Sequence, residues 1–303
     1  MYDMHEADHD AEALAARFER DRPRLRAVAY RMLGSLSEAE DAVQEAWIRL
    51  HRTGGRELRD VSAWLTTVVG RVCLDMLRSR AARREEPLDV HVPDPVITGE
   101  TAPEEHAVLA DSVGLALLVV LDRLAPPERV AFVLHDLFAV PFDAIAPVVD
   151  RTPAATRQLA SRARKRVRGE GPAPETDLAR RRQVVEAFLA AARAGDLDGL
   201  VAVLDPDVVM RVDAGPEAAG VSRLVHGAGQ VAGEAVQFRA AAPFARVVLV
   251  NGAPGLMTAP HGDPLSVIDF TVRDGLVVEI NLIADRARLR DLGLPGGLDA
   301  PQA

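Results

Sequence analysis

The sequence contains one cysteine, one lysine and few aromatic residues. Cys73 has no second cysteine to pair with, which excludes an internal disulfide framework and a zinc site with several cysteine ligands. Because Cys73 lies within a helical apolar pattern, we interpret it as a small buried hydrophobic residue. Aromatic residues make up 4% of the chain, so the cores must be built from Leu, Val and Ala.

The chain also lacks long apolar runs and a basic overall charge. No run is long enough to span a bilayer, and the polar, acidic start from Met1 to Asp10 differs from a signal peptide. We therefore expect a cytoplasmic protein with no membrane partner. A net charge of −9 argues against binding nucleic acid by bulk attraction, so any DNA binding must come from a local patch.

A helix-turn-helix is predicted between Pro141 and Arg168. Asp150-Arg151 forms the turn, and Thr152-Pro153 begins the second helix with an N-cap residue followed by proline. Apolar residues at helical spacing form the first helix and the inner face of the second: Phe142, Ile145, Ala146, Val149, Thr156, Ala160, Ala163 and Val167. The outer face of the second helix carries Arg157, Gln158, Ser161, Arg162 and Lys165.

The charge of this segment favours DNA as its partner. Residues 151–168 contain seven basic residues and no acidic one. A second helix of this kind enters the major groove in helix-turn-helix proteins. The alternative is a solvated basic helix end.

A helical block, residues 11–84, comes first in the chain. The sequence SEAE at residues 37–40 is a capping box that predicts a helix start. An apolar stripe follows it, formed by Ala39, Ala42, Val43, Ala46, Trp47 and Leu50. The opposite face carries Asp41, Gln44, Glu45 and Ile48. This face is either a solvated acidic surface or a docking surface for a basic protein.

A polar loop over residues 51–60, which includes Arg56 and Arg59, separates this helix from the next. The next helix begins at Ser62 and carries Trp64, Arg71 and Arg78. Aromatic and arginine side chains suit single-stranded nucleic acid, because every base offers a face for stacking. A purely structural role for these residues is the alternative.

The rest of the chain predicts two linkers and an α+β domain. Residues 85–103 are rich in Pro, Asp and Glu and are predicted to form a linker, and residues 169–174 a second one. Between them, helical signals run from Glu104 to Leu124 and from Arg129 to Phe138. Helices are expected at 178–194, 197–204 and 231–239, and β-like runs at 208–212, 246–251, 265–272 and 276–283. Turns are expected at 252–255 and 273–275 in a mostly antiparallel sheet.

Several motifs together resemble the extracytoplasmic-function sigma factors. Residues 29–35 (AYRMLGS), 39–50 (AEDAVQEAWIRL) and 63–69 (AWLTTVV) are similar to region 2, and the segment from PPER at 126–129 to Arg168 resembles region 4. The third block resembles the SnoaL-like, cone-shaped domain of one subgroup, through residues 195–200 (GDLDGL), 205–209 (DPDVV) and 251–255 (NGAPG). The order of these motifs along the chain carries the resemblance.

The resemblance implies a role for each surface. Asp41, Gln44, Glu45 and Ile48 would dock on core RNA polymerase, and Arg56, Arg59, Trp64, Arg71 and Arg78 would lie at the −10 element of promoter DNA. The −35 element would be bound by Thr152, Pro153, Ala154, Thr156, Arg157, Gln158, Ser161, Arg162 and Lys165. Arginine can hydrogen-bond with guanine and glutamine with adenine, so the arginines and the glutamine of this set could read bases. Phosphates would be held by Arg164, Lys165, Arg166 and Arg168.

The resemblance also implies that the C-terminal domain tunes activity in cis. VPDP at 92–95 is similar to the Pro-containing linker motif of the subgroup. DAGP at 213–216 departs from its glycine-rich loop, and ADRARL at 284–289 follows its C-terminal motif only loosely. These departures concern the regulatory contacts and not the sigma regions.

We therefore expect a multi-domain protein with two all-α sigma domains followed by an α+β SnoaL-like domain. The expected ranges are 1–84 for region 2, 85–107 for a linker, 108–169 for region 4, 170–177 for a linker, 178–295 for the C-terminal domain and 296–303 for a tail. No cofactor, metal or catalytic residue is expected. The expected partners are core RNA polymerase and promoter DNA, and the resemblance allows an unidentified small ligand of the C-terminal domain.

Two alternatives stay open at this stage. Related cone-shaped domains catalyse cyclisation or isomerisation, and here Asp213, His226, Asp269 and Asn281 are the residues that could face a cavity. The second alternative is a ligand-sensing helix-turn-helix regulator that binds duplex DNA without polymerase. The Asp41, Gln44 and Glu45 face argues against it, because a plain repressor has no use for a docking helix.

Overall fold

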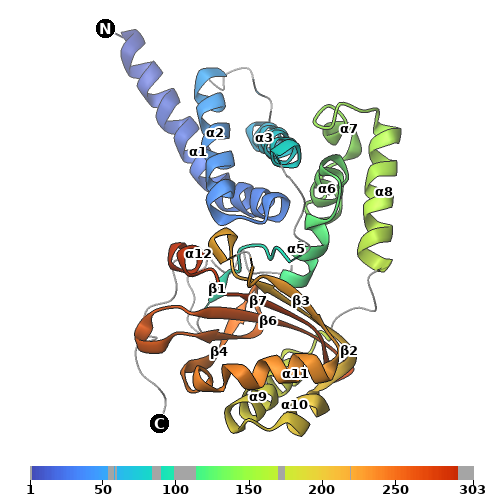
Figure 1. Ribbon diagram of the computed structural model, residues 1–303. Coiled ribbons are helices and arrows are strands. Elements are labelled where there is room, and N and C mark those ends of the chain that lie inside the picture. Colours follow the sequence, from blue (N-terminus) through green and yellow to red (C-terminus); the bar gives the residue numbers. More distant parts are fainter. Residues whose placement is uncertain are drawn as a thin grey trace. The chain divides into compact units, whose positions relative to one another are not determined.

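The computed structural model describes residues 2–53, 58, 60–83, 90–98, 114–169, 175–218 and 220–292. The chain divides into two compact units, Met1–Glu85 with Val120–Glu170 and Glu86–Val119 with Gly171–Ala303. The first unit is helical, and the second contains the sheet (Figure 1). Arg56 and Arg59, the helix expected from Glu104 to Val113, and the expected tail lie outside the described residues.

Three helices form the first part of the helical unit: α1 (Tyr2–Leu33), α2 (Leu36–Thr53) and α3 (Val61–Arg83). The apolar stripe predicted on α2 is buried, with Ala39, Ala42, Val43, Ala46 and Leu50 inside. Trp47 is half-buried and packs against Phe18 of α1, with ring centroids 4.8 Å apart. Cys73 is buried, and burial raises the pKa of its thiol far above the ordinary value.

The capping box predicted at residues 37–40 is wrong in its details. Helix α2 begins at Leu36, and the Ser35 hydroxyl accepts a hydrogen bond from the Glu38 N–H at 3.5 Å. Glu40 does not reach back to the helix start, because its carboxylate pairs with Arg22 and Arg26 of α1. A tertiary ion pair has replaced the local cap.

The second part of the helical unit is the predicted helix-turn-helix. Helix α5 (Leu115–Asp122) leads into α6 (Pro126–Phe132), α7 (Phe142–Ile145) and α8 (Pro153–Gly169). The Thr152 hydroxyl accepts a hydrogen bond from the Ala155 N–H at 3.2 Å, which confirms the predicted N-cap. The helix expected from Arg129 to Phe138 is present, but its last part, Val133–Leu137, is π-helical.

The second unit is built on one sheet whose described strands follow the order β1-β4-β5-β6-β7-β2-β3. Only β2 and β7 pair in parallel among these strands. The strands are β1 (Ile97–Thr98), β2 (Leu204–Asp213), β3 (Arg223–His226), β4 (Ala245–Val250), β5 (Ala253–Thr258), β6 (Ser266–Arg273) and β7 (Leu276–Ile283). The helices are α9 (Leu178–Ala194), α10 (Leu197–Val203), α11 (Ala228–Gln237) and α12 (Arg286–Asp291).

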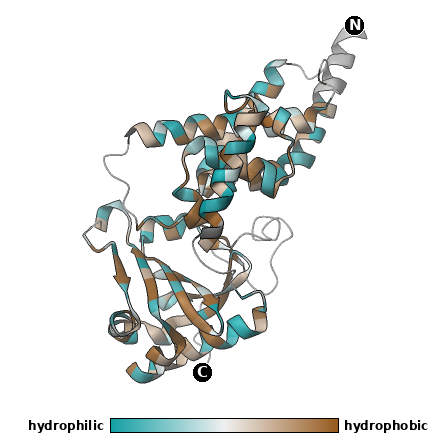
Figure 2. Cartoon of the chain, turned by 90° about the vertical axis from the view of Figure 1, so that its right-hand side faces the viewer, coloured by the Kyte–Doolittle hydropathy of each residue, from teal (hydrophilic) through white to brown (hydrophobic). Residues whose placement is uncertain are grey.

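Helices α9, α10 and α11 cover one face of this sheet (Figure 1). The core between them contains Phe188 and Leu200 from the helices and Met210, Phe270 and Ile280 from the strands. Figure 2 shows hydrophobic residues along most of the strands, whereas the helices carry both hydrophobic and hydrophilic residues. Because side chains alternate along a strand, the residues next to these core positions face the other side of the sheet.

Two strands lie where the sequence predicted a turn and a linker. Strand β5 begins at Ala253, so the turn consists of Asn251 and Gly252, and both have positive φ. Pro254 is tolerated because β6 pairs with β5 only from Gly255 onward. Strand β1 comes from the expected linker, with Ile97 opposite Val250 of β4.

Candidate nucleic-acid interface

The outer face of α8 presents the side chains that were predicted to meet DNA. Thr152, Pro153, Ala154, Arg157, Gln158, Arg162 and Lys165 are exposed, and Ser161 is half-exposed. Thr156 is the exception, because it is fully buried and its hydroxyl donates to the Thr152 carbonyl at 2.9 Å. We therefore remove Thr156 from the contact surface and assign it to the packing of α8.

A buried carboxylate at the start of α6 orients two arginines of this face. Glu128 accepts from the Arg162 Nε at 2.7 Å and from an Arg166 Nη at 2.6 Å. Glu128 is buried, while each arginine side chain keeps about half of its surface exposed. Arg162 is bound to Glu128 through Nε, and its half-exposed guanidinium has further N–H groups that can donate to a base edge. Sequence analysis missed Glu128, which lies 34 residues before Arg162.

Neighbouring basic residues on α8 also have defined environments. The Arg157 guanidinium lies 5.3 Å from the centre of the Phe142 ring, which stacks on His135 with centroids 3.8 Å apart. His135 belongs to the π-helical turn, and its Nδ1 lies 3.0 Å from the Val140 carbonyl. Arg164 pairs with Asp136 at 2.6 Å, whereas Lys165 is exposed. The α8 face thus consists of ordered arginines beside one exposed lysine.

The face of α2 opposite its apolar stripe is open, as predicted. Asp41 and Gln44 are exposed, Glu45 is half-exposed, and Ile48 keeps 36% of its surface in contact with solvent. Glu45 pairs with Arg49 at 2.8 Å on the same helix. An isoleucine surrounded by acidic and amide groups on an exposed helix face is a surface suited to a protein partner.

Helix α3 places Arg71 and Arg78 beside the turn of the helix-turn-helix. Each guanidinium lies 3.9 Å from a carboxylate oxygen of Asp150. Asp150 lies in the turn between α7 and α8 and has a φ of 53°, a left-handed conformation that Asp adopts more readily than most residues. Trp64 is half-buried one turn from the start of α3. The arginines predicted to contact the −10 element therefore share a carboxylate in the turn of the helix-turn-helix.

The two halves of the helical unit are also joined by a buried arginine. Arg129 of α6 donates to the Met32 carbonyl of α1 at 2.9 Å and to the Asp122 carboxylate of α5 at 2.9 Å. Arg31 lies over the Phe138 ring at 5.1 Å. In this structure the region 2-like and region 4-like helices form one packed unit.

Residues 90–98, part of the expected linker, are bound to the α+β domain. The Val92 N–H donates to the Asp213 carboxylate at 2.9 Å, and Arg288 of α12 pairs with Asp94, with the Val92 carbonyl and with Asp213. We call Val92, Asp94, Asp213 and Arg288 the linker clamp. The sequence placed Asp213 and Arg288 in regulatory motifs, but no local pattern joins them to residues more than 100 positions earlier.

A second contact fixes the same segment further along. The Val96 N–H donates to the Asn251 side chain at 3.0 Å, and the Asn251 N–H donates to the Val96 carbonyl at 2.8 Å. Val92, Val96 and Ile97 are buried. Residues 90–98, which the sequence assigns to a linker over 85–107, are therefore packed as part of the α+β domain.

Asp213 is held as a carboxylate by its surroundings. Burial alone would raise its pKa, but hydrogen bonds from His91 and from the Val92 N–H, together with the charge of Arg288, lower the pKa to about 2. Its oxygen lies 3.3 Å from the His91 Nδ1. The clamp thus keeps its central charge at neutral pH.

The four residues considered for catalysis do not face the cavity between sheet and helices. Asp269 lies between the core residues Ile268 and Phe270, and Asn281 lies between Ile280 and Leu282, so both point to the opposite face of the sheet. Asp213 and His226 lie on that face too, next to the core residues Val212 and Val225. The expectation that they could share a cavity is wrong, because the strand pleat turns them away from it.

Asp269 is the most perturbed acid of this opposite face. It is buried, and burial raises its pKa to about 6. The Asn281 amide donates to it at 3.4 Å. Within the described ranges, no group of three or more His, Cys, Asp or Glu could hold a metal ion, and no helix is long and apolar enough to cross a membrane.

Comparison with known proteins agrees with the two helical surfaces. Residues 17–83 match Sigma-70 region 2 and residues 114–167 match Sigma-70 region 4. The chain is 43% identical to the ECF RNA polymerase sigma factor SigJ of Mycobacterium tuberculosis over 285 residues, which are 88% of this chain and 90% of SigJ. It is 40% identical to the probable sigma factor SigI of the same species over 211 residues, 69% of this chain and 72% of SigI.

The match extends to the C-terminal domain. The crystal structure of M. tuberculosis SigJ superposes with a TM-score of 0.75 at 37% identity, and the alignment covers 93% of this chain and all of that one. The two helical sigma regions and the SnoaL-like α+β domain predicted from the sequence are therefore confirmed. The surfaces on α2, α3 and α8 lie within the two matched sigma regions, and the similarity to SigJ extends over most of this chain. The chain therefore belongs to the extracytoplasmic-function RNA polymerase sigma factors, which bind core polymerase and direct promoter-specific initiation without being enzymes.

Proposed function

We propose that α8 reads the −35 element of the promoter. Arg157, Gln158, Ser161 and Arg162 form its exposed polar face and would contact base edges, whereas Lys165 would contact phosphate. The support for Arg162 is its anchoring on Glu128, which fixes the side chain before DNA arrives. A side chain already ordered loses less conformational entropy on binding.

Two further surfaces would complete the sigma activity. The α2 face of Asp41, Gln44, Glu45 and Ile48 would dock on core polymerase, and Trp64, Arg71 and Arg78 would contact the −10 element, with Arg56 and Arg59 in the loop before α3. The contacts of Arg71 and Arg78 with Asp150 occupy the same guanidinium groups. Binding at −10 would therefore exchange this carboxylate for DNA phosphates.

We infer that the C-terminal domain controls the sigma regions through residues 90–98. The linker clamp is the observation that carries this inference, because it joins the only covalent connection between regions 2 and 4 to the sheet of the C-terminal domain. A bound linker limits the separation that the two regions can reach. The same proposal includes two further points. The C-terminal domain binds a small ligand, and the protein acts in the cytoplasm, where RNA polymerase works.

The test is promoter-dependent transcription with purified core polymerase and the full chain carrying Arg288→Met. Methionine keeps a long apolar side chain but loses every donor that Arg288 supplies to the clamp. We expect initiation to change at least threefold, since a charged, half-buried hydrogen-bond network of this kind contributes about 1.5–3 kcal/mol. Templates should include the DNA upstream of its own gene.

The matched control is Arg290→Met on the same helix. Arg290 makes an exposed pair with Asp263 at 3.6 Å and takes no part in the clamp. Initiation by Arg290→Met should equal that of the unchanged chain. Equal initiation by both variants, with core binding intact, would show that the clamp does not control the sigma regions.

A point substitution is sharper here than deletion of the domain. The compact unit that contains the domain also includes residues 86–119. A chain cut before α9 would leave buried linker residues such as Val92 and Val96 without their partners. Changes in activity would then mix loss of control with exposure of apolar surface.

A further inference from the structure

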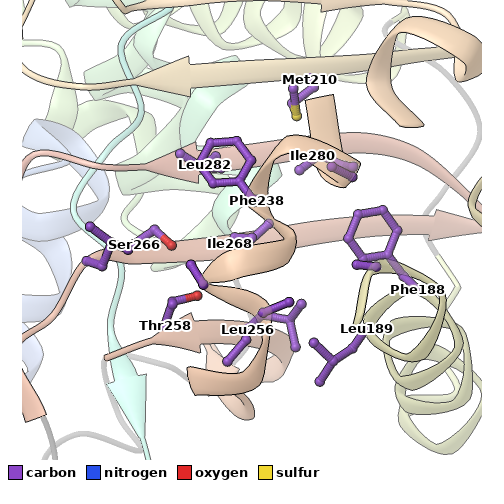
Figure 3. A pocket seen from close by; sticks show the side chains of 16 residues that line it. Phe188, Leu189, Met210, Phe238, Leu256, Thr258, Ser266, Ile268, Ile280 and Leu282 are labelled. Carbon is purple, nitrogen blue, oxygen red and sulfur yellow. The ribbon is translucent and has the colours of Figure 1, made fainter. Parts of the chain in front are cut away.

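The C-terminal domain contains a cavity between the helix-covered face of its sheet and α9 and α11. Its empty volume is about 640 Å³, part of which is open to solvent. Phe188 and Leu189 of α9 form one wall, and Leu256, Ile268 and Leu282 of the strands form another (Figure 3).

The lining of the cavity contains no ionisable side chain. All but two of its 16 residues are Ala, Leu, Ile, Met or Phe. The buried acids of the long strands, Asp213 and Asp269, are on the opposite face of the sheet, where they alternate with core residues. A charged ligand would therefore lose its hydration without gaining a counter-ion, which is costly in an apolar site.

The two polar residues of the lining provide a hydrogen-bonding site. Thr258 of β5 and Ser266 of β6 are directly opposite each other in the sheet, and both are at least nine-tenths buried. Both residues line the cavity, so their hydroxyls can contact an occupant. Both oxygens lie at the end of the cavity away from Phe188 (Figure 3). Each hydroxyl can both donate and accept a hydrogen bond, so together they can bind one oxygen-containing group of a ligand.

The opening of the cavity is bordered by Phe238, which follows α11. Its ring lines the cavity and yet 44% of the residue is exposed. The neighbouring positions Ala235, Ala241 and Ala242 are small, so they leave space beside the ring. An occupant of the cavity would cover this exposed aromatic surface and gain the free energy of its burial.

We propose that this cavity binds a small, uncharged and mainly hydrocarbon molecule that carries one hydroxyl or carbonyl group. The hydrocarbon part lies against Phe188, Leu256 and Leu282, and the oxygen hydrogen-bonds with Thr258 and Ser266. The proposal names the chemistry of the ligand in the proposed function. It rests on that function only for the consequence of binding and not for binding itself.

The experiment uses the full chain and the uncharged fluorescent probe N-phenyl-1-naphthylamine. We expect saturable binding of one probe per chain and its displacement by 1-decanol. Decanoate, which has the same chain length but a negative charge at neutral pH, should displace it at least tenfold less effectively. No saturable binding, or equal competition by the alcohol and the carboxylate, would overturn the proposal.

Two variants locate the site. Ala235→Trp on α11 places a large side chain in the cavity and should weaken probe binding at least tenfold. The control is Gln237→Trp on the same helix. Gln237 is exposed and does not line the cavity, so this variant should bind the probe like the unchanged chain. Phe238→Ala removes an exposed ring without disturbing the core and should weaken binding severalfold. Unchanged binding by both Ala235→Trp and Phe238→Ala would place the probe elsewhere and refute the site.

The hydroxyl pair has its own test. Thr258→Val with Ser266→Ala removes both oxygens at nearly constant volume and should weaken 1-decanol at least threefold more than it weakens the probe. Equal effects on both molecules would remove the hydrogen-bonding part of the proposal. These measurements use no polymerase, so their failure is distinct from a negative Arg288→Met result in transcription.

Discussion

Asp269→Asn should stabilise the C-terminal domain at neutral pH. The pKa of Asp269 is raised by burial from 3.8 to about 6. Between these two values the folded state keeps the proton that the unfolded state has lost, so stability falls as pH rises. At 1.36 kcal/mol for each pH unit, the penalty reaches about 3 kcal/mol above pH 6 and is about 1 kcal/mol at pH 4.5. Asparagine carries no charge and should remove this slope.

The assay has to report on the C-terminal domain alone. Both tryptophans, Trp47 and Trp64, lie in the helical unit, so fluorescence follows that unit and not the sheet. Hydrogen exchange in urea, measured by mass spectrometry on peptides from β6 and β7, gives the stability of the sheet. The measurement is made at pH 4.5 and pH 8 and corrected for the intrinsic exchange rate at each pH. The gain from Asp269→Asn should be larger at pH 8 by about 2 kcal/mol.

The matched control is Asp207→Asn, an exposed carboxyl at the start of β2 in the same domain. It should change the exchange of β6 and β7 little at either pH, and fluorescence unfolding of the helical unit should be the same for all three chains. A gain from Asp269→Asn that is equal at both pH values would refute the reasoning, because it would show an effect of shape or hydrogen bonding and not of buried charge.

Three substitutions test the surfaces of the helical unit. Glu128→Gln should weaken binding to a −35 duplex by about 1 kcal/mol, or about fivefold, because Arg162 loses its orienting carboxylate. Binding is measured by fluorescence anisotropy, and an equal loss of affinity for a scrambled duplex would contradict this prediction. Glu45→Arg should raise the Kd for core polymerase about tenfold by reversing the charge of the α2 face, and an unchanged Kd would remove Glu45 from the docking surface. Asp150→Asn should raise affinity for a single-stranded −10 oligonucleotide up to about threefold, because the exposed pairs that it makes with Arg71 and Arg78 are weak competitors. No change would mean that Asp150 does not compete with DNA.

Local signals were enough to predict the recognition helix and the first helix of the C-terminal domain. The Thr152-Pro153 start of α8 is recovered in the structure, and α9 has the predicted limits of Leu178 and Ala194. Asp177 caps α9 and Gly195 ends it in a left-handed conformation. Caps and helical periodicity depend on residues within a few positions, so they can be read from a single sequence.

Contacts between distant segments could not be predicted in this way. The composition of residues 85–103 indicates a linker, yet Ile97 pairs with Val250 because an edge of the sheet is available to it. Glu128 is a helix-start residue in the sequence and an arginine anchor in the structure. The sequence shows that Asp269 and Ile268 lie on opposite faces of a strand. It does not show which of these faces the helices cover, because that depends on the register of the strand in the sheet.

The pairing of β1 with β4 also has a consequence for newly made protein. Ile97 is synthesised long before Val250, and at about 5–20 residues per second the interval is on the order of ten seconds. Both sigma regions, which end at residue 167, are complete before the strand that receives the linker exists. Each nascent chain therefore passes through a period in which its sigma regions are present and the sheet that we propose controls them is not. The length of that period depends on the speed of translation.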